Sequence, residues 1–426
     1  MTRFQVTESA MQGRWAFVPA MVSMVLLCAT VSPTSAAQFE VPANRKAAEI
    51  LPAELLKGPN YQVRKTVVSY GYMHHWTVDS DFGTFKVTGD GALRALIREI
   101  YAIAALIEIS QGEAFAKSVA YAAKQPFQFA GKMVTDPVDT VSALPKGVFG
   151  IFENVGTSIS MEHDPSEDAM LEQALFVSSW KRDFAAEYGV DVYSSNKVLQ
   201  EQLNKVGWAS AIGGLSVSAA MTPLTGGAGV FFKATRLSNQ VTEALKEEPP
   251  SRLHIINHDR LAAMGISKDL AERFLDHPAF TPRHDTVIVA ALADLKNPRG
   301  RDVFLNAILS AQDEASATFY MNIAQTLQGY NETVSRIQEI TVIGGLVVAR
   351  ALNGRALIPF PLDHGVWGTR ASWIFNHVKE TNQANGFQGK YDIWVTGTVS
   401  PRTRRELTAL GIEATENVDE KIGFLD

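Results

Sequence analysis

The stretch VGWASAIGGLSVSAAMTPLTGGAGVFF, Val206 to Phe232, carries no charged residue and is dense in glycine, alanine and serine. Small residues recur in it at a spacing of four, and in a helix they form one flat strip: Gly207, Ser210, Ala211, Gly214 and Ser218. A strip of this kind lets a second helix backbone approach closely. We therefore expect a close-packed helix pair, around which the rest of the chain is organised.

Pro223 removes a backbone donor and is expected to end the first helix of this stretch. A helix from Val206 to Met221 would be about 24 Å long, which is shorter than the ~30 Å hydrocarbon core of a membrane. We therefore expect a central helix buried on all sides in a soluble protein. The alternative is membrane insertion as a re-entrant hairpin that turns at Thr222 to Gly227.

Residues 1–37 have the features of an export signal. Arg14 precedes an uncharged run from Trp15 to Val31, and small residues follow it. This pattern predicts a cleaved signal peptide that ends near Ala36 or Ala37, and hence a periplasmic or secreted protein.

The cleaved signal peptide has one competing interpretation, and its start is open. The apolar run could instead be an uncleaved membrane anchor, or translation could begin at Met11. Lipidation of Cys28 is disfavoured because Leu27, just before it, is large.

The composition is that of a globular protein, with 46% hydrophobic and 20% charged residues, and its length suggests two or three domains. Lys and Arg number 39 against 45 Asp and Glu, a net charge of −6, and no basic block occurs. Nonspecific nucleic-acid binding is therefore not expected. Because Cys28 is the only cysteine, the cleaved chain would form no disulfide and no cysteine-ligated metal site.

We predict an α+β fold, with a predominantly helical body between a small N-terminal antiparallel β meander and a C-terminal α/β unit. Residues 38–60 hold three prolines and little periodicity, which predicts a flexible arm. Residues 61–89 are rich in β-branched and aromatic residues and predict the meander. Residues 90–337 predict the helical body. Residues 338–426 predict the α/β unit, with a hairpin at Asn353-Gly354.

Helix-capping residues divide the predicted helical body. Asp90 is expected to cap its first helix. Ser267 and Thr281 are expected to cap later helices, the second with Pro282 at the first helical position. The pattern from Asp302 to Gln328 predicts one long helix.

The densest group of titratable side chains lies in the predicted meander: His74, His75, Asp79 and Asp81. Histidine is suited to proton transfer and metal binding near neutral pH. On a strand, His74 and Trp76 face one way while His75 and Asp79 face the other, so only part of the group can converge. We consider these residues catalytic candidates; the alternative is a polar strand surface.

A fifth catalytic candidate is His364, which with Asp363 lies in the loop PLDHGVWG after a predicted strand. No G-x-S-x-G, G-x-G-x-x-G or P-loop pattern accompanies it, so the sequence supplies no nucleophile or nucleotide motif.

Two further histidine groups are weaker. His254 and His258 stand four apart, but the pair lacks the glutamate of the H-E-x-x-H zinc motif. A second group brackets the Thr281 cap, and its members are expected to cap the helix and to lie on the polar surface: Asp276, His277, His284 and Asp285. The sequence thus assigns no metal site and leaves the cofactor unknown.

The predicted strand YDIWVTG leads into a helix with Pro401 at its first position. The free N–H groups and positive dipole at such an N-terminus can hold an anion. The candidate anion-binding residues are Thr396, Gly397, Thr398, Ser400 and Arg402. The alternative is a serine-capped helix with solvated arginines.

The export signal and the lack of a catalytic motif favour a non-catalytic envelope protein that contacts a membrane surface or a protein partner. An alternative is an exported hydrolase or metal-dependent enzyme that uses the His and Asp residues in a cleft between meander and helical body. A second alternative is a toxin-like protein that inserts Val206 to Phe232 into a membrane.

Overall fold

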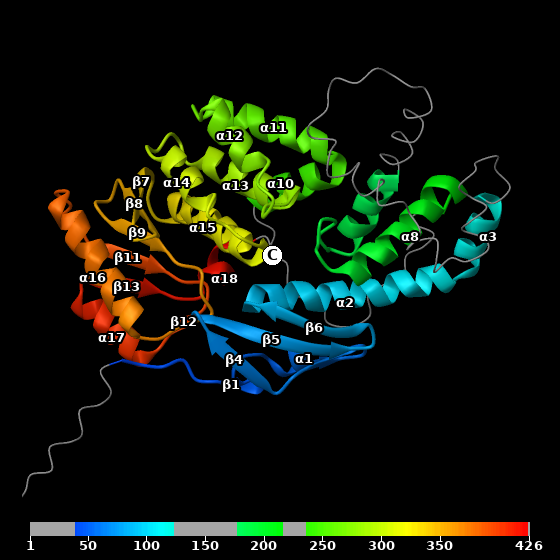
Figure 1. Ribbon diagram of the computed structural model, residues 1–426, viewed down its shortest axis with the longest axis horizontal. Coiled ribbons are helices and arrows are strands. Elements are labelled where there is room, and N and C mark those ends of the chain that lie inside the picture. The colour runs from blue at the N-terminus through cyan, green and yellow to red at the C-terminus, as the bar shows by residue number, and fades with distance from the viewer. Residues whose placement is uncertain (1–38, 123–176, 216–235, 425–426) are drawn as a thin grey trace, which may run out of the picture. The chain divides into compact units, whose positions relative to one another are not determined.

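The described residues form both helices and β-sheets, which confirms the predicted α+β class. The structure, a computed structural model, describes residues 39–122, 177–215 and 236–424 (Figure 1). The predicted signal peptide and residues 216–232 of the glycine-rich stretch lie outside the described residues.

Residues 45–88 form an antiparallel half-barrel sheet, as expected for a meander. Its strands are β1 (Arg45–Lys46), β2 (Lys57–Gly58), β3 (Tyr61–Val63), β4 (Thr66–Tyr70), β5 (Met73–Ser80) and β6 (Gly83–Thr88). β5 is central, with β3 and β4 on one edge and β6 on the other. Its side chains alternate, so His74, Trp76 and Val78 are buried while His75 and Asp79 face outward.

The segment expected to be a flexible arm is folded onto the half-barrel. Besides β1 and β2, it contains the 3-10 helix η1 (Ala47–Glu49) and the helix α1 (Ala53–Leu56). Ala47, Leu51 and Leu55 are buried in the same core as Trp76. Burial of these apolar side chains holds the segment against the half-barrel although it contains three prolines.

Helix α2 (Asp90–Gln111) lies along the half-barrel (Figure 1) and fills it with Leu93, Ile97 and Ile100. Asp90 is the first helical residue rather than the expected cap, because Gly89, at φ 102°, occupies the cap position. Glycine adopts this backbone conformation at little cost. The Asp90 side chain is thereby available for contacts outside its own helix.

The expected close helix pair forms between α3 (Glu113–Ala122) and α8 (Lys197–Gly213). Ser118 of α3 donates a hydrogen bond of 2.5 Å to the backbone oxygen of Ala209, and a side chain at Gly213 would collide with Ser118. The helix ends at Gly213, before the predicted Met221, because Gly214 adopts a left-handed conformation at φ 72°.

A further helix over residues 177–187 packs against the opposite end of this strip. A side chain at Gly207 would come within 3.0 Å of Lys181 and 3.3 Å of the backbone oxygen of Val177. Within the described ranges, no helix is long and apolar enough to span a membrane.

The remaining helices of the body are α10 (Arg236–Glu247), α11 (Pro250–Ala263), α12 (Lys268–Leu275), α13 (Pro282–Asp294), α14 (Arg301–Ile308) and α15 (Glu314–Thr333). Ser267 and Thr281 cap α12 and α13 as predicted. The single pattern predicted over Asp302 to Gln328 is two helices, because Asp313 accepts a hydrogen bond from the Ser316 N–H and starts α15.

The C-terminal sheet has the order β13-β11-β9-β8-β7. Its elements, together with a short parallel pair, are β7 (Ile337–Ile343), β8 (Leu346–Ala351), β9 (Ala356–Pro359), β10 (His364–Gly365), α16 (Thr369–Ala384), β11 (Tyr391–Trp394), β12 (Thr398–Val399), α17 (Pro401–Ala409), β13 (Ile412–Thr415) and α18 (Val418–Ile422). β9, β11 and β13 are parallel, and α16 and α17 connect them.

The Asn353-Gly354 hairpin is present between the antiparallel strands β8 and β9, with Gly354 at φ 77°. A second hairpin was not predicted. Gly344 and Gly345, both at positive φ, turn the chain between β7 and β8, so the apolar run TVIGGLVVARAL is two strands.

Candidate functional site

The loops that follow β9 and β11 lie side by side at one end of the C-terminal sheet. The two strands are parallel neighbours, and the carboxyl ends of such strands meet at the same sheet edge. Gly397 N donates a 2.7 Å hydrogen bond to Leu362 O, and Thr398 N donates one of 3.0 Å to Asp363 O. This backbone pairing fixes the position of Asp363.

The Asp363 carboxylate connects this loop to the half-barrel and to α2. Its Oδ2 accepts a 2.6 Å hydrogen bond from the backbone N–H of His74, and its Oδ1 accepts one of 3.0 Å from that of Asp90. Gly89 has no side chain with which to cap α2, so Asp363 satisfies a free N–H of the first helical turn. A negative charge there also interacts favourably with the helix dipole.

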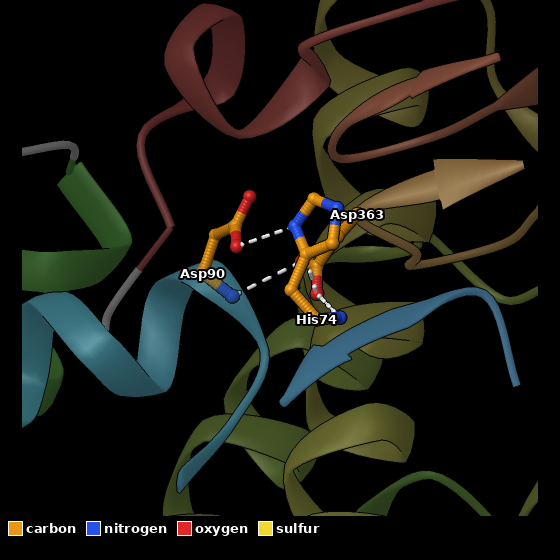
Figure 2. A group of neighbouring side chains, drawn as sticks. All are labelled: His74, Asp90 and Asp363. Carbon is orange, nitrogen blue, oxygen red and sulfur yellow. Dashed lines mark hydrogen bonds and ion pairs between the residues drawn. The ribbon is translucent and has the colours of Figure 1, made fainter. Parts of the chain in front are cut away.

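His74 and Asp90 form the second half of the same cluster (Figure 2). His74 Nδ1 lies 2.9 Å from Asp90 Oδ1, and Trp76 Nε1 donates to that same oxygen at 2.9 Å. Figure 2 shows the three side chains converging from β5, from the start of α2 and from the loop after β9.

The cluster leaves one polar atom without a partner. His74 is 1% exposed, and no described residue forms a hydrogen bond with its Nε2. A buried polar atom without a partner costs about 1–3 kcal/mol, so it calls for an explanation such as a bound ligand, ion or water.

The cluster also concentrates negative charge away from water. Burial and the neighbouring Asp90 carboxylate raise the pKa of Asp363 above its ordinary value, although the N–H groups of His74 and Asp90 and the His74 charge oppose this effect. His74, Asp90 and Asp363 each offer one ligand atom, and these atoms all lie within 4.8 Å of one another.

The cluster borders a cleft of about 920 Å³. Ligand sites in proteins have volumes of roughly 300–1,000 Å³. The cleft is lined by residues of the half-barrel, α2, the segment before α8, the starts of α13 and α15 and the C-terminal loops. Its charged lining residues include Arg45, Glu49, Lys86, Arg94, Arg98, Glu99, Asp191, Arg283, Glu314, Asp419 and Glu420.

Glu99 marks an acidic part of the cleft. Ser194 Oγ donates to one oxygen of its carboxylate, and Asn196 Nδ2 donates to the other at 2.9 Å. Burial raises the pKa of Glu99 despite these two hydrogen bonds, which lower it, and the nearby charges of Asp191 and Glu314 add to the rise. The cleft therefore presents acidic groups and arginines from different elements, an environment for a polar, charged ligand.

His284 also lines the cleft, and it is buried rather than at the surface as expected. Its Nδ1 accepts a 3.2 Å hydrogen bond from the Thr281 N–H, and its Nε2 lies 3.1 Å from Thr318 Oγ1. The expected capping role is therefore confirmed. The imidazole is neutral in this arrangement, because a protonated Nδ1 could not accept.

His284 is expected to make the protein sensitive to acid. Burial, with a smaller contribution from Arg283, lowers its pKa from 6.5 to about 4. Its contribution to stability is complete above the unfolded value of 6.5 and is lost as the pH falls toward 4. We expect a loss of about 3 kcal/mol from this group, measured by urea unfolding across pH.

The variant His284→Gln isolates this contribution. The difference in unfolding free energy between wild type and variant should shrink as the pH falls from 6.5 to 4. Parallel curves for the two proteins over that range would show that His284 is not the group responsible.

The other meander candidates do not join His74. His75 Nδ1 lies 3.0 Å from Thr88 Oγ1, Asp79 is bonded to Arg64 and Thr84, and Asp81 accepts from Asn60 at 3.0 Å. These contacts lie on the outer face and the turns of the half-barrel.

His364 lies next to Asp363 but uses its side chain elsewhere. Its Nδ1 is 2.9 Å from Thr398 Oγ1, and burial, followed by the charges of Arg45 and His74, lowers its pKa. His254 and His258 both lie on α11.

Two of the predicted anion-binding residues, Ser400 and Arg402, interact with a carboxylate of the protein itself. Glu40 Oε2 accepts hydrogen bonds of 2.7 Å from Ser400 Oγ and from the Trp367 N–H. Ser400 also caps α17 by accepting from the Thr403 N–H. Burial alone would raise the pKa of Glu40, but these hydrogen bonds and the charge of Arg402 outweigh it and lower the pKa. Glu40 thus occupies the place expected for an external anion.

The other three predicted anion-binding residues are engaged in backbone pairing with the β9 loop or with His364. Thr396 Oγ1 donates to Leu362 O at 2.8 Å, whereas Gly397 and Thr398 donate their N–H groups to the same loop.

Sequence reasoning did not select Asp90 or Asp363 as site residues. The available signals were the position of Asp90 directly after a strand and the polar loop that holds Asp363 beside His364. No protein-family model, curated protein or solved structure matches this chain, so the interpretation of the site depends on its own geometry.

Proposed function

We propose that this is an exported protein that binds a polar, charged small molecule in the cleft beside His74, Asp90 and Asp363. The observation that carries the proposal is the cleft itself, about 920 Å³ in volume and lined by acidic and basic side chains from separate elements. Clefts that bind ligands combine such a volume with a few convergent polar groups. The proposal keeps the division of the chain into meander, helical body and C-terminal α/β unit, because residues of all three parts line the cleft.

The described part of the small-residue stretch packs against neighbouring helices. Gly207 and Gly213 face Val177 and Ser118 of neighbouring helices, so this part of the strip is used in internal packing. Contact with a membrane surface or protein partner, and insertion of Val206 to Phe232, stay predictions, and residues 216–232 of that stretch lie outside the described ranges.

A hydrolytic enzyme acting in the same cleft is the second candidate function. The observation that favours it is the His74, Asp90 and Asp363 cluster, because an imidazole oriented by a carboxylate is suited to proton transfer. A panel of ester, amide and phosphoester substrates, assayed with wild type and His74→Ala, tests this reading. Turnover that depends on His74 supports it, and turnover unaffected by the substitution argues against it.

The binding proposal is tested by obstructing the cleft without disturbing the core. Ala315 is exposed and lines the cleft, so Ala315→Trp should fill part of it. Ala262 is an exposed alanine on α11 that does not line the cleft, and Ala262→Trp serves as the matched control.

The measurement is thermal unfolding of each protein against a library of charged metabolites. Mass action predicts about 2.7 kcal/mol of stabilisation when a ligand is at 100 times its dissociation constant. Ligands that stabilise wild type and Ala262→Trp should fail to stabilise Ala315→Trp. Equal stabilisation of all three proteins would place the binding site elsewhere.

A further inference from the structure

We infer that His74, Asp90 and Asp363 form a binding site for a divalent transition-metal ion at the wall of the cleft. The inference does not depend on which ligand the cleft takes. Its basis is the convergence of one nitrogen and two carboxylate oxygens from three segments that are far apart in sequence.

The distances suit an ion with small adjustments. Ligand atoms that each lie ~2.0–2.2 Å from an ion are about 3 Å apart at right angles and about 4 Å apart when opposite. His74 Nδ1 is 2.9 Å from Asp90 Oδ1 and 3.9 Å from Asp363 Oδ2. The largest distance between any two of the three ligand atoms is at most 4.8 Å. It must shorten by less than one bond length to match the spacing of ligand atoms around an ion.

The donor set indicates the kind of ion. Mg²⁺ and Ca²⁺ prefer oxygen ligands throughout, whereas imidazole with carboxylates is typical of Zn²⁺, Mn²⁺ and related ions. Three protein ligands leave coordination positions open, which is the arrangement of catalytic rather than structural sites. The Asp90 side chain is 22% exposed, and both Asp90 and His74 line the cleft.

Three N–H donors already orient the two carboxylates. The backbone N–H groups of His74 and Asp90 hold Asp363, and the Trp76 indole N–H holds Asp90. A carboxylate oxygen has two lone pairs, so each can keep its hydrogen bond and still bind an ion. Such outer hydrogen bonds fix the direction of metal-binding side chains.

The charge and the protons of the cluster are consistent with this assignment. Two carboxylates with little exposure to water lie close together, and a cation would offset the repulsion between them. Binding requires the Nδ1 lone pair, so the neutral imidazole then carries its proton on Nε2. That nitrogen has no partner among the described residues, so placing the proton there breaks no existing hydrogen bond.

Titration of the purified, chelator-treated full chain with Mn²⁺ and with Zn²⁺ in a calorimeter tests the site. We expect one ion per chain, and at least a 10-fold weaker affinity in His74→Ala and in Asp90→Asn. His75→Ala is the matched control, because His75 is the next residue on β5 and bonds to Thr88 instead. An affinity that is the same in His74→Ala and in wild type would overturn the inference.

A second measurement needs no variant and therefore does not depend on folding of the substituted chains. In ¹⁵N-histidine NMR spectra of the wild-type protein, the Nδ1 signal of His74 should change from a protonated to a metal-bound shift as Zn²⁺ is added. An unchanged His74 signal at saturating Zn²⁺ would exclude the site. Either outcome leaves the Ala315→Trp test of the cleft unaffected, so the two proposals fail separately.

Discussion

Replacement of Asp363 by alanine is expected to lower the free energy of unfolding by roughly 3–5 kcal/mol. The substitution leaves two backbone N–H groups without an acceptor, that of His74 inside the half-barrel and that of Asp90 at the start of α2. Each buried donor left unsatisfied costs about 1–3 kcal/mol, and the start of α2 loses a negative charge that interacts with its dipole. Urea unfolding of wild type and variant at neutral pH measures the difference.

The variant Asp363→Asn separates hydrogen bonding from charge. Asparagine retains one acceptor oxygen in place of two and carries no buried charge, so we expect about half the loss seen with alanine. If Asp363→Ala unfolds within 1 kcal/mol of wild type, the two N–H groups must find other acceptors, and the connection between the C-terminal loop and α2 is unimportant for stability.

Local sequence rules predicted the features that depend on neighbouring residues. The alternation of β5 placed His74 and Trp76 together on one face, and the Thr281 cap was expected from residues within one helical turn. The Asn353-Gly354 hairpin likewise follows from the backbone preferences of two residues. In each case the decisive contacts span only a few positions.

The candidate site could not be predicted in the same way. Asp363 bonds to residues 289 and 273 positions earlier in the chain, and no spacing rule connects them. Asp90 has the sequence features of a helix N-cap. In the structure Gly89 occupies the N-cap position, and the Asp90 carboxylate contacts His74 instead.

The α17 N-terminus shows the same limit. The rule that such an end attracts an anion was sound, but the occupant is Glu40, which lies 360 positions before Ser400. Tertiary structure supplies the anion, and of the residues selected for an external ligand, Ser400 and Arg402 interact with Glu40 of the N-terminal segment.

Gly397→Ala is expected to destabilise the protein by roughly 3 kcal/mol and to weaken metal binding, although the residue bears no functional group. A methyl group there would lie 2.6 Å from the carbonyl carbon and 2.7 Å from the Cα of Asp363, and closer still to its backbone oxygen. Overpacking of this kind forces backbone shifts that cost about 1–3 kcal/mol or more. The segment that must move is the one that carries the Asp363 carboxylate.

Gly368→Ala is the matched control for this substitution. A methyl group at Gly368 meets only the backbone oxygen of Glu40, at an ordinary 3.7 Å. Loss of the glycine N-cap of α16 should cost less than about 1 kcal/mol. Unfolding measurements and Mn²⁺ titration of both variants test the predicted effects on stability and metal binding. Because the Asp363 backbone and carboxylate move together, Gly397→Ala should lose stability and Mn²⁺ affinity in parallel, whereas normal affinity in a destabilised variant would mean that the ion is bound without Asp363.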